Sequence, residues 1–313
     1  MAAIAVSNAP KQDLEFRNED GELLKLCLDL TVYWFGSVFD RVEGVLDFYT
    51  QAISLLGNEI KYYLTEAMEG GREVDLDALN LLPNWLTQDD RRDLYILSLE
   101  SGYRKDTLSD SGFYFCADED PESRSGALRL ILPTTYAMQP QSYVELVLSL
   151  VGKLDFQSGH GGFSVNWFPT ADSAEEALSL FPTIARRYPG IDLADLDITL
   201  YAVGTAKTAG IKCINWLTLL GPELATLAGG AEAIQRNLPL ECPIFPAGHG
   251  GLLIQAGAQP DIGDRNRHAD LTAYRAVGRV LAPLRMQHHP DFIGATPASP
   301  NEDLTQEWLA RFD

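Results

Sequence analysis

Three short runs of apolar residues decide the fold: DLYILSLES (93–101), GFYFCA (112–117) and ALRLILPT (127–134). Each run is rich in Leu, Ile, Tyr or Phe and is bounded by polar residues, a pattern typical of β-strands. The connections between them, GYRKDTLSDS (102–111) and DEDPESRSG (118–126), are short and polar. Consecutive strands with short polar connections favour an antiparallel meander.

Before this meander, the run LLKLCLDLTVYWF (23–35) mixes alternation with β-branched and aromatic residues and predicts a strand. Apolar residues then recur at helical spacing from Ser37, a suitable N-cap, to Glu66. This spacing predicts one long amphipathic helix, bent at Gly44 or Gly57. Residues 67–90 are expected to form an irregular connection.

After the meander the same patterns predict five helices and four strands. The helices are expected at 140–154, 173–188, from Pro222, at 271–284 and at 304–312; the strands are expected at 162–168, 212–219, 242–245 and 251–256. Runs of strands separated by helices predict α+β architecture, with antiparallel or mixed sheets flanked by helices. We expect a flexible tail over residues 1–20 and a single α+β domain over 21–313.

A short repeat leaves a second organisation open. The tetrapeptide Gly-His-Gly-Gly occurs at 159–162 and again at 248–251, each time before an apolar strand. Two related αβ halves, divided near 155–160, would explain the repeat. A glycine-rich hairpin turn at each place also explains the glycines, because glycine tolerates positive φ.

Charge limits the partners that the protein can bind. The 313 residues include 24 Lys and Arg against 44 Asp and Glu, so the net charge is 24 − 44 = −20. Such a surface repels phosphate, which argues against nucleic acid and anionic membranes as partners. It favours a basic partner and speeds encounter with it. Solubility alone is an equally good explanation of the acidity.

Cysteine usage and the N-terminus point to the cytoplasm. The first residues contain no basic segment followed by an apolar stretch of signal-peptide length, and no window reaches the roughly 18 apolar residues of a membrane span. The cysteines are too far apart for a CxxC motif, and we expect them to be reduced and buried: Cys27, Cys116, Cys213 and Cys242.

A search for catalytic motifs gives no site. The His-Gly-Gly stretches would suit a lipase oxyanion loop, but the chain has no Gly-x-Ser-x-Gly elbow. It also has no HExxH zinc motif and no phosphate loop. Paired-carboxylate chemistry stays open, because acids are plentiful. The sequence therefore predicts a protein without catalytic residues, metal or cofactor.

Two blocks resemble a known family: GIKCINWLTLLGPELATLAGG (210–230) and GLLIQAGAQPDIGDRNRHADLTAYRAVGRVLAPLR (251–285). They are similar to segments of the type VI secretion immunity family, and the N-terminal strand and helix fit the same family more loosely. The resemblance implies a protein that binds and neutralises a cognate effector toxin of nuclease type. It implies no catalytic residue. It extends over residues 20–290.

Nuclease toxins present a basic, phosphate-binding cleft, so an acidic inhibitor can occlude the active or substrate-binding surface. Two acidic stretches are the candidate contact surfaces, although both also suit solvated loops. They comprise Asp118, Glu119, Asp120 and Glu122 in the first, and Asp192, Asp195 and Asp197 in the second. An effector-loading adaptor and an unrecognised hydrolase remain the alternative functions, and homo-oligomerisation stays open.

Overall fold

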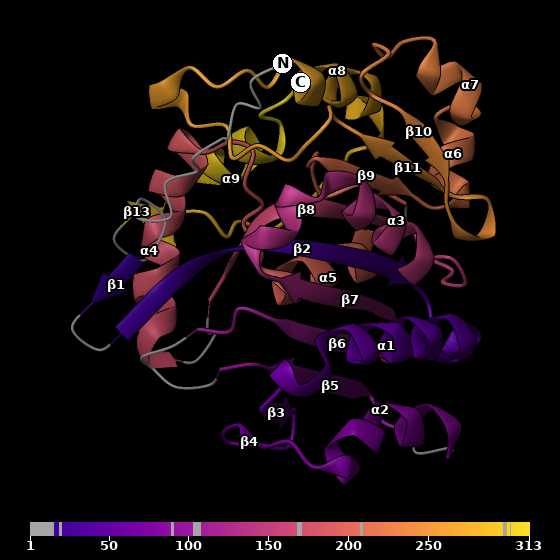
Figure 1. Cartoon of the computed structure of the whole chain (residues 1–313), viewed down its shortest axis with the longest axis vertical. Helices are drawn as coiled ribbons and strands as arrows, with labels where there is room; N and C mark the ends of the chain where they lie inside the picture. Colours follow the sequence, from indigo (N-terminus) through magenta and orange to yellow (C-terminus); the bar gives the residue numbers. More distant parts are fainter. Residues whose placement is uncertain are drawn as a thin grey trace, which may run out of the picture.

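Strand β2 (Gly21–Phe35) lies at the centre of the molecule, and the other elements are arranged around it (Figure 1). The computed structural model describes residues 16–18, 21–88, 91–102, 108–167, 171–206, 209–296, 299–300 and 302–313. Residues 28–35 of this strand pair with β7 on one side, and residues 25–33 pair with β8 on the other. Leu28 to Phe35 face Leu132 to Ser125, so the register places Phe35 opposite Ser125 at the end of the strand.

The strands form one eleven-stranded sheet in which every pairing between strands is antiparallel. Its order is β10-β11-β9-β8-β2-β7-β6-β5-β3-β4, and β1 pairs beside this path with β2. The α+β prediction is confirmed, in its antiparallel form. The bounds are β1 Phe16–Asn18, β3 Tyr62–Thr65, β4 Arg72–Glu73, β5 Leu94–Glu100, β6 Gly112–Asp118, β7 Ser125–Leu132, β8 Ser158–Asn166, β9 Leu217–Leu220, β10 Ile244–Pro246 and β11 Leu252–Gln255. A separate ribbon pairs β12 (Ala295–Thr296) with β13 (Ser299–Pro300).

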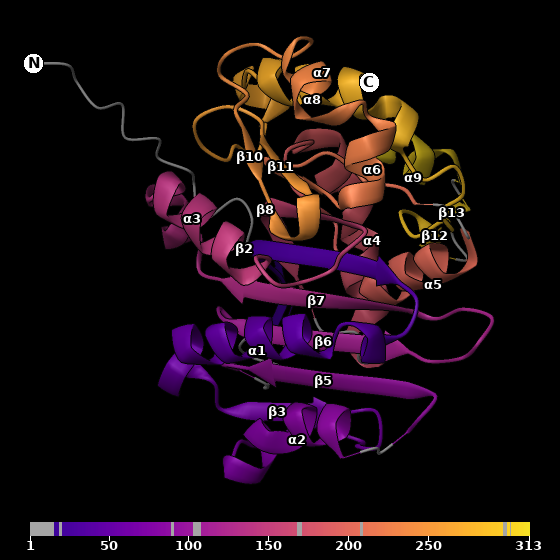
Figure 2. The same cartoon turned by 90° about the vertical axis from the view of Figure 1, so that its right-hand side faces the viewer.

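Helices cover both faces of the sheet (Figure 2). Their bounds are α1 Val42–Leu56, α2 Leu76–Thr87, α3 Pro140–Leu150, α4 Ala171–Arg187, α5 Leu196–Ala206, α6 Pro222–Leu227, α7 Gly230–Gln235, α8 Thr272–Leu281 and α9 Glu302–Leu309. On α1, Phe48 and Tyr49 contact Phe113 of the sheet with ring centroids 6.3 and 5.2 Å apart. Trp85 of α2 meets Tyr95 at 5.9 Å on the same face. These pairs hold α1 and α2 on the face of β5 and β6 that the meander sequence made apolar.

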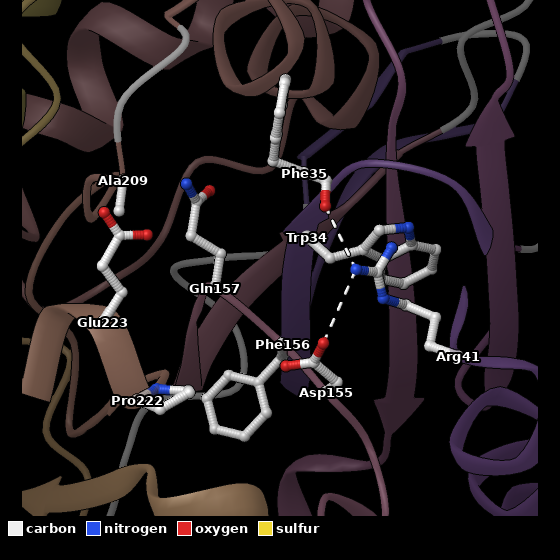
Figure 3. Close-up of a pocket in the computed structure, with 9 residues that line it drawn as sticks. All are labelled: Trp34, Phe35, Arg41, Asp155, Phe156, Gln157, Ala209, Pro222 and Glu223. Carbon is white, nitrogen blue, oxygen red and sulfur yellow. Dashed lines mark hydrogen bonds and ion pairs between the residues drawn. The ribbon is translucent and has the colours of Figure 1, made fainter. Parts of the chain in front are cut away.

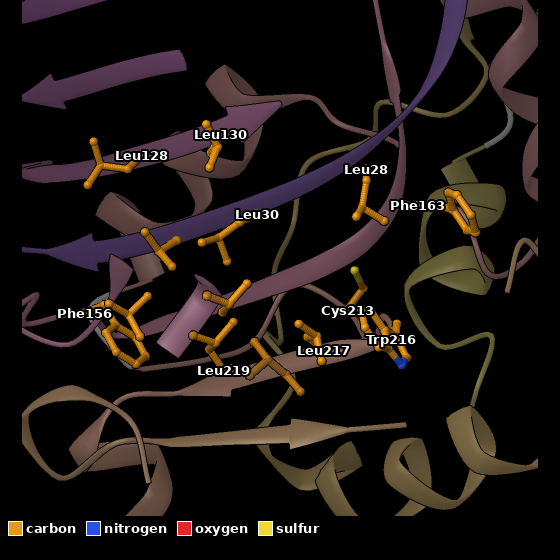
Figure 4. Packing of buried hydrophobic residues seen from close by; sticks show 14 of the residues in the cluster. Leu28, Leu30, Leu128, Leu130, Phe156, Phe163, Cys213, Trp216, Leu217 and Leu219 are labelled. Atoms are coloured by element: carbon orange, nitrogen blue, oxygen red, sulfur yellow. The ribbon is translucent and has the colours of Figure 1, made fainter. Parts of the chain in front are cut away.

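The two faces of β2 differ in chemistry because side chains alternate along a strand. Leu28, Leu30, Val32 and Trp34 point to one face and belong to the main apolar core. Figure 4 shows Leu28 and Leu30 beside Leu128, Leu217 and other buried residues of neighbouring strands. The opposite face carries Asp29, Thr31 and Tyr33, all buried. Tyr33 packs in a smaller apolar cluster with residues of α5, so α5 covers this second face.

The prediction of one long helix from Ser37 to Glu66 is wrong at both ends. Ser37 instead accepts a bond from the Phe39 N–H and caps a 3₁₀ turn at Val38–Asp40. Helix α1 ends at Leu56, since Gly57 adopts φ +52°. Tyr62–Thr65 then pair with β5 as strand β3. Tertiary strand pairing therefore overrides the helical spacing of Ile60 and Tyr63.

Residues 67–90 are not an irregular connection, because they contain helix α2. The Asp75 carboxylate accepts the Ala78 N–H at 2.8 Å and begins this helix as its N-cap. Part of the expected tail is also ordered, because Phe16–Asn18 pair with β2 as β1. Residues 1–15, 19 and 20 lie outside the described residues.

The two Gly-His-Gly-Gly segments adopt different conformations. Gly159–Gly162 lie inside strand β8, so the turn expected there is wrong. Gly248–Gly250 form a 3₁₀ turn in which His249 has φ +54° and Gly250 φ +85°, as a glycine-rich turn predicts. The first segment thus lies in β8, and the second lies between β10 and β11 of the same sheet. The division into two related halves stays a prediction.

Candidate partner-binding surface

The loop after β6 contains the first predicted acidic stretch, and half of its carboxylates are used inside the protein. Glu119 Oε1 accepts the Val38 N–H at 2.6 Å, and Oε2 accepts the Ser37 hydroxyl at 2.7 Å. Asp118 accepts the Asp120 N–H at 2.9 Å and the Ser123 hydroxyl at 2.7 Å. These two residues therefore shape the loop and attach it to the chain that follows β2.

The other two acids of this loop face solvent. Asp120 and Glu122 are exposed, and the Asp120 carboxylate orients the loop further by accepting the Glu122 N–H at 2.8 Å. Arg124 lies beside them, with its Nε 3.6 Å from Glu119 Oε2. Since this guanidinium already pairs with Glu119, the carboxylates of Asp120 and Glu122 are the part of the loop available to a cationic partner.

The second acidic stretch divides in the same way. Asp192 is 0% exposed and does not reach the surface. Asp195 is buried and begins α5, where its Oδ1 accepts the Ile198 N–H at 3.2 Å. Burial raises the pKa of Asp195 above its ordinary value. Asp197, in the first turn of α5, is exposed, so it alone of the three can meet a partner through its carboxylate.

Helix α5 brings the two stretches together, although Asp120 and Asp197 are far apart in the sequence. The Tyr114 hydroxyl on β6 donates to Asp197 Oδ1 at 3.3 Å, near the start of the helix. The Ser125 hydroxyl donates to the Leu200 carbonyl oxygen at 3.3 Å. Near the end of the helix, a Cβ on Gly204 would lie 2.2 Å from the Ser123 carbonyl oxygen. Glycine is required there because the helix touches the acidic loop directly.

Tyr201 stands out on this helix because its side chain is 62% exposed. Its neighbours Leu200 and Ala202 are buried against Tyr33 and Ala127 of the sheet. Tyrosine is enriched in protein interfaces and among their hot spots, so this exposed ring marks a candidate contact. Helix α5 is absent from the elements that the sequence pattern predicted. The signal was present in Asp195, a favourable N-cap followed by LDITLYAVGTA. We call Asp120, Glu122, Asp197 and Tyr201 the acidic surface.

A pocket of about 230 Å³ opens where β2 ends, next to the acidic loop. The Gly36 N–H donates to the Arg124 carbonyl oxygen at 2.8 Å and joins the pocket rim to that loop. We call it the β2-end pocket. Its lining consists of Trp34, Phe35, Arg41, Asp155, Phe156, Gln157, Ala209, Pro222 and Glu223 (Figure 3).

Arg41, the positively charged residue of this pocket, is bound by groups of the protein itself. Its guanidinium donates to the carbonyl oxygens of Phe35, Gly36 and Ser37 at 2.7–3.2 Å. It also lies 3.7 Å from the Asp155 carboxylate. Arg41 therefore fixes the chain that leaves β2 and neutralises Asp155 at the same time. Figure 3 shows Gln157 and Glu223 on the other side of the pocket.

A cluster of buried charged groups lies beneath the second face of the sheet. Asp192 Oδ1 is 3.1 Å from the Lys212 ammonium, and its Oδ2 is 3.2 Å from His160 Nε2. Burial by itself raises the pKa of Asp192, but the charges of Lys212 and His160 outweigh it and hold that pKa well below its usual value. Arg129 forms a similar buried pair with Asp29 at 2.8 Å.

The burial of these charged residues indicates a structural role. His160, Asp192 and Lys212 are at most 2% exposed, so a substrate cannot reach them in this conformation. A buried pair with good geometry keeps its charges satisfied without becoming a catalytic site. His160 comes from the first Gly-His-Gly-Gly segment, which gives that motif a structural role.

Three further properties of the described residues concern cofactors and membranes. Their histidine, cysteine and acidic side chains form no group of three or more placed to hold a metal ion. All four cysteines are buried free thiols, as the sequence predicts. None of the helices within these residues has the length and apolarity needed to cross a membrane.

Comparison with known proteins identifies relatives. The model of a family described as TsiV, type VI immunity for VRR-NUC, matches residues 41–312. A solved structure of the Pseudomonas aeruginosa T6SS protein PA0821 superposes with a TM-score of 0.82, over 96% of this chain and 87% of that one. At 22% identity this likeness shows a common fold. The search of curated proteins gave no match.

Proposed function

The chain belongs to the TsiV family, type VI immunity for VRR-NUC, and from this premise we propose that it neutralises its nuclease effector by covering a basic, nucleic-acid-binding face with the acidic surface. A nuclease must attract the phosphate backbone of its substrate, so its binding face is rich in lysine and arginine. An inhibitor with complementary charge steers towards that face and excludes the substrate once bound.

The observation that supports this proposal most is the convergence of the two acidic stretches on one surface. Helix α5 places Asp197 beside the strand that leads into Asp120 and Glu122, through the Tyr114–Asp197 hydrogen bond. Three exposed carboxylates and one exposed aromatic ring thus lie on adjoining elements. The carboxylates supply steering, and Tyr201 supplies an apolar anchor. The net charge of −20 strengthens the same field.

We further propose that the role is non-catalytic. The charged groups of Asp192 and Lys212 are buried under the sheet, where they satisfy each other. Immunity requires a stable complex, and a complex needs shape and charge complementarity but no chemistry. The predicted cytoplasmic location fits this role, since a nuclease effector acts where the nucleic acid is.

The direct experiment is co-expression of the effector's VRR-NUC domain with and without this chain, followed by measurement of growth and co-purification. We expect rescue of growth together with a stable complex. Binding without rescue would indicate an effector-loading adaptor. Absence of both binding and rescue would contradict the proposal.

The location of the contact is tested by charge reversal. We expect Asp120→Lys with Glu122→Lys to slow association with the effector about tenfold and to reduce its dependence on salt, because steering depends on exposed charge. Glu232→Lys with Glu241→Lys is the matched control, since both control residues are exposed acids on or near α7. Equal effects in the two double variants would mean that net charge alone, not this surface, governs association.

A further inference from the structure

We propose that the β2-end pocket receives an arginine side chain of the effector and acts as the anchor of the complex. The inference rests on the proposed function, because it assigns a contact to the same partner. It adds a second, chemically distinct site beside the acidic surface. The exposed acids would set the rate of encounter, and the pocket would set the lifetime of the complex.

The size of the pocket indicates a single side chain as its occupant. Its volume is about 230 Å³, whereas pockets for cofactors and drug-sized ligands span about 300–1,000 Å³. Interface hot spots are side chains that insert into small, well-packed pockets of this kind.

Two acceptor groups of the pocket, Glu223 and Gln157, lack a side-chain donor among the described residues. Glu223 is exposed in the first turn of α6 and has no ion pair among the residues that the structure describes. The Gln157 Oε1 atom is buried and accepts no hydrogen bond from those residues. A buried acceptor without a partner costs about 1–3 kcal/mol. A guanidinium presents five N–H donors in a planar fork and can serve a carboxylate and an amide oxygen together.

The walls of the pocket suit the rest of an arginine. Phe156 and Pro222 form an apolar side, and Phe35, 46% exposed, stands at the edge (Figure 3). Guanidinium groups stack on aromatic faces, and the methylene stem packs on apolar surface. Arg41 does not compete for Glu223, because three backbone carbonyls and Asp155 already hold it.

Contacts through buried residues also connect the pocket with the elements of the acidic surface. Phe35 pairs with Ser125 across β2 and β7, and Ser125 contacts α5 through the Leu200 carbonyl. A partner docked on Asp120, Asp197 and Tyr201 therefore lies within reach of the pocket. A central anchor beside a polar rim is the usual arrangement of a tight interface.

The test measures association and dissociation rates of the full chain with a catalytically inactive VRR-NUC domain of its effector. Two variants alter the pocket: Glu223→Gln removes its free carboxylate, and Ala209→Arg fills its mouth with a guanidinium of the chain itself. We expect each to raise the dissociation rate about tenfold or more and to change the association rate less than about twofold. Glu232→Gln and Leu76→Arg are matched controls at exposed positions outside the pocket.

The outcomes separate this inference from the proposed function. If the wild-type chain binds the effector and both pocket variants dissociate at the wild-type rate, the pocket assignment is wrong and the immunity role stands. If the wild-type chain does not bind, both proposals fail. If the free chain is a dimer that Ala209→Arg splits, the occupant is a second copy, which also overturns the inference. Thermal unfolding of each variant verifies that the fold is retained.

Discussion

The Tyr114 hydroxyl donates a hydrogen bond to the Asp197 carboxylate across 3.3 Å and links β6 to α5. The strand carries the acidic loop at its end, and the helix carries Tyr201. This contact and the close approach of Gly204 to Ser123 fix the relative position of the two acidic stretches. The acidic surface is therefore a product of helix packing on the sheet.

We expect Tyr201→Ala to weaken effector binding without weakening the fold. The ring is 62% exposed, so its removal changes the free energy of unfolding by less than about 0.5 kcal/mol. Loss of an aromatic anchor in an interface costs about 1–2 kcal/mol or more, which corresponds to about a tenfold rise in Kd. Calorimetric titration with the effector domain measures the Kd. Leu76→Ala, at a residue 78% exposed, is the matched control, and an equal loss of affinity there would contradict the role of Tyr201.

Glu119 and Asp120 are neighbours with opposite expected behaviour. Glu119→Ala removes the acceptor for Ser37 and for the Val38 N–H, and we expect it to lower the free energy of unfolding by about 1–3 kcal/mol. Asp120→Ala leaves no buried donor without an acceptor, so we expect it to lower the free energy of unfolding by less. Urea unfolding followed by circular dichroism compares the two. A larger loss in Asp120→Ala would show that the loop is not attached through Glu119.

Removing one charge of the Asp192–Lys212 pair is expected to destabilise the fold more than removing both. Asp192→Asn leaves the buried Lys212 ammonium without its counter-charge, which costs about 3–5 kcal/mol. Removing both charges with Asp192→Asn and Lys212→Met is expected to be milder than the single change. Chemical unfolding of the wild type, Asp192→Asn, Lys212→Met and the double variant forms a double-mutant cycle. A double variant less stable than Asp192→Asn would argue against an unpaired charge as the cause.

The same pair makes the stability of the fold depend on pH in the acid range. The folded state holds the pKa of Asp192 well below its ordinary value of 3.8. Its contribution is therefore fully present above about pH 4 and is lost only as the pH falls towards the folded pKa. We expect the acid-unfolding curve of Asp192→Asn to lose this low-pH component, as monitored by tryptophan fluorescence.

The buried His289 predicts that stability also depends on pH at higher values than for Asp192. Burial lowers its pKa from 6.5 to about 4, and its ring nitrogens lie 2.8 Å from the Pro290 carbonyl oxygen and 3.2 Å from the Thr199 hydroxyl. The unfolded state binds the proton more readily, so the contribution to stability is complete above pH 6.5 and declines as the pH falls to 4. The decline is at most about 3 kcal/mol, since one pKa unit corresponds to about 1.4 kcal/mol.

The measurement for His289 compares unfolding midpoints between pH 4 and pH 7 in the wild type and in His289→Gln. The variant cannot take up the proton, so its midpoint is expected to change less over this range. His249→Gln is the control, because His249 is an exposed residue on the 3₁₀ turn after β10. Parallel curves for wild type and His289→Gln would show that other groups cause the dependence.

The sequence predicted the elements whose local pattern agrees with their tertiary environment. The meander of β5, β6 and β7 formed as expected because its residues are apolar on the covered face and its loops are polar. The pattern failed between Ile60 and Thr65, where helical spacing gave way to pairing of β3 with β5. It failed again at 158–162, because glycines that suit a turn also suit a strand packed against β2 and β9. Strand pairing is a long-range interaction, so a local pattern does not contain it.

By itself the sequence determined the α+β class, the acidity, the family resemblance and the set of carboxylates from which the candidate surface is drawn. Only the tertiary structure decided which of those carboxylates face a partner. Asp192 and Asp197 are five residues apart, yet one is sealed against Lys212 and the other is exposed at the start of α5. The physical reason is that the burial of a charge depends on whether a counter-charge from elsewhere in the chain satisfies it, and Lys212 meets Asp192 only when the chain folds.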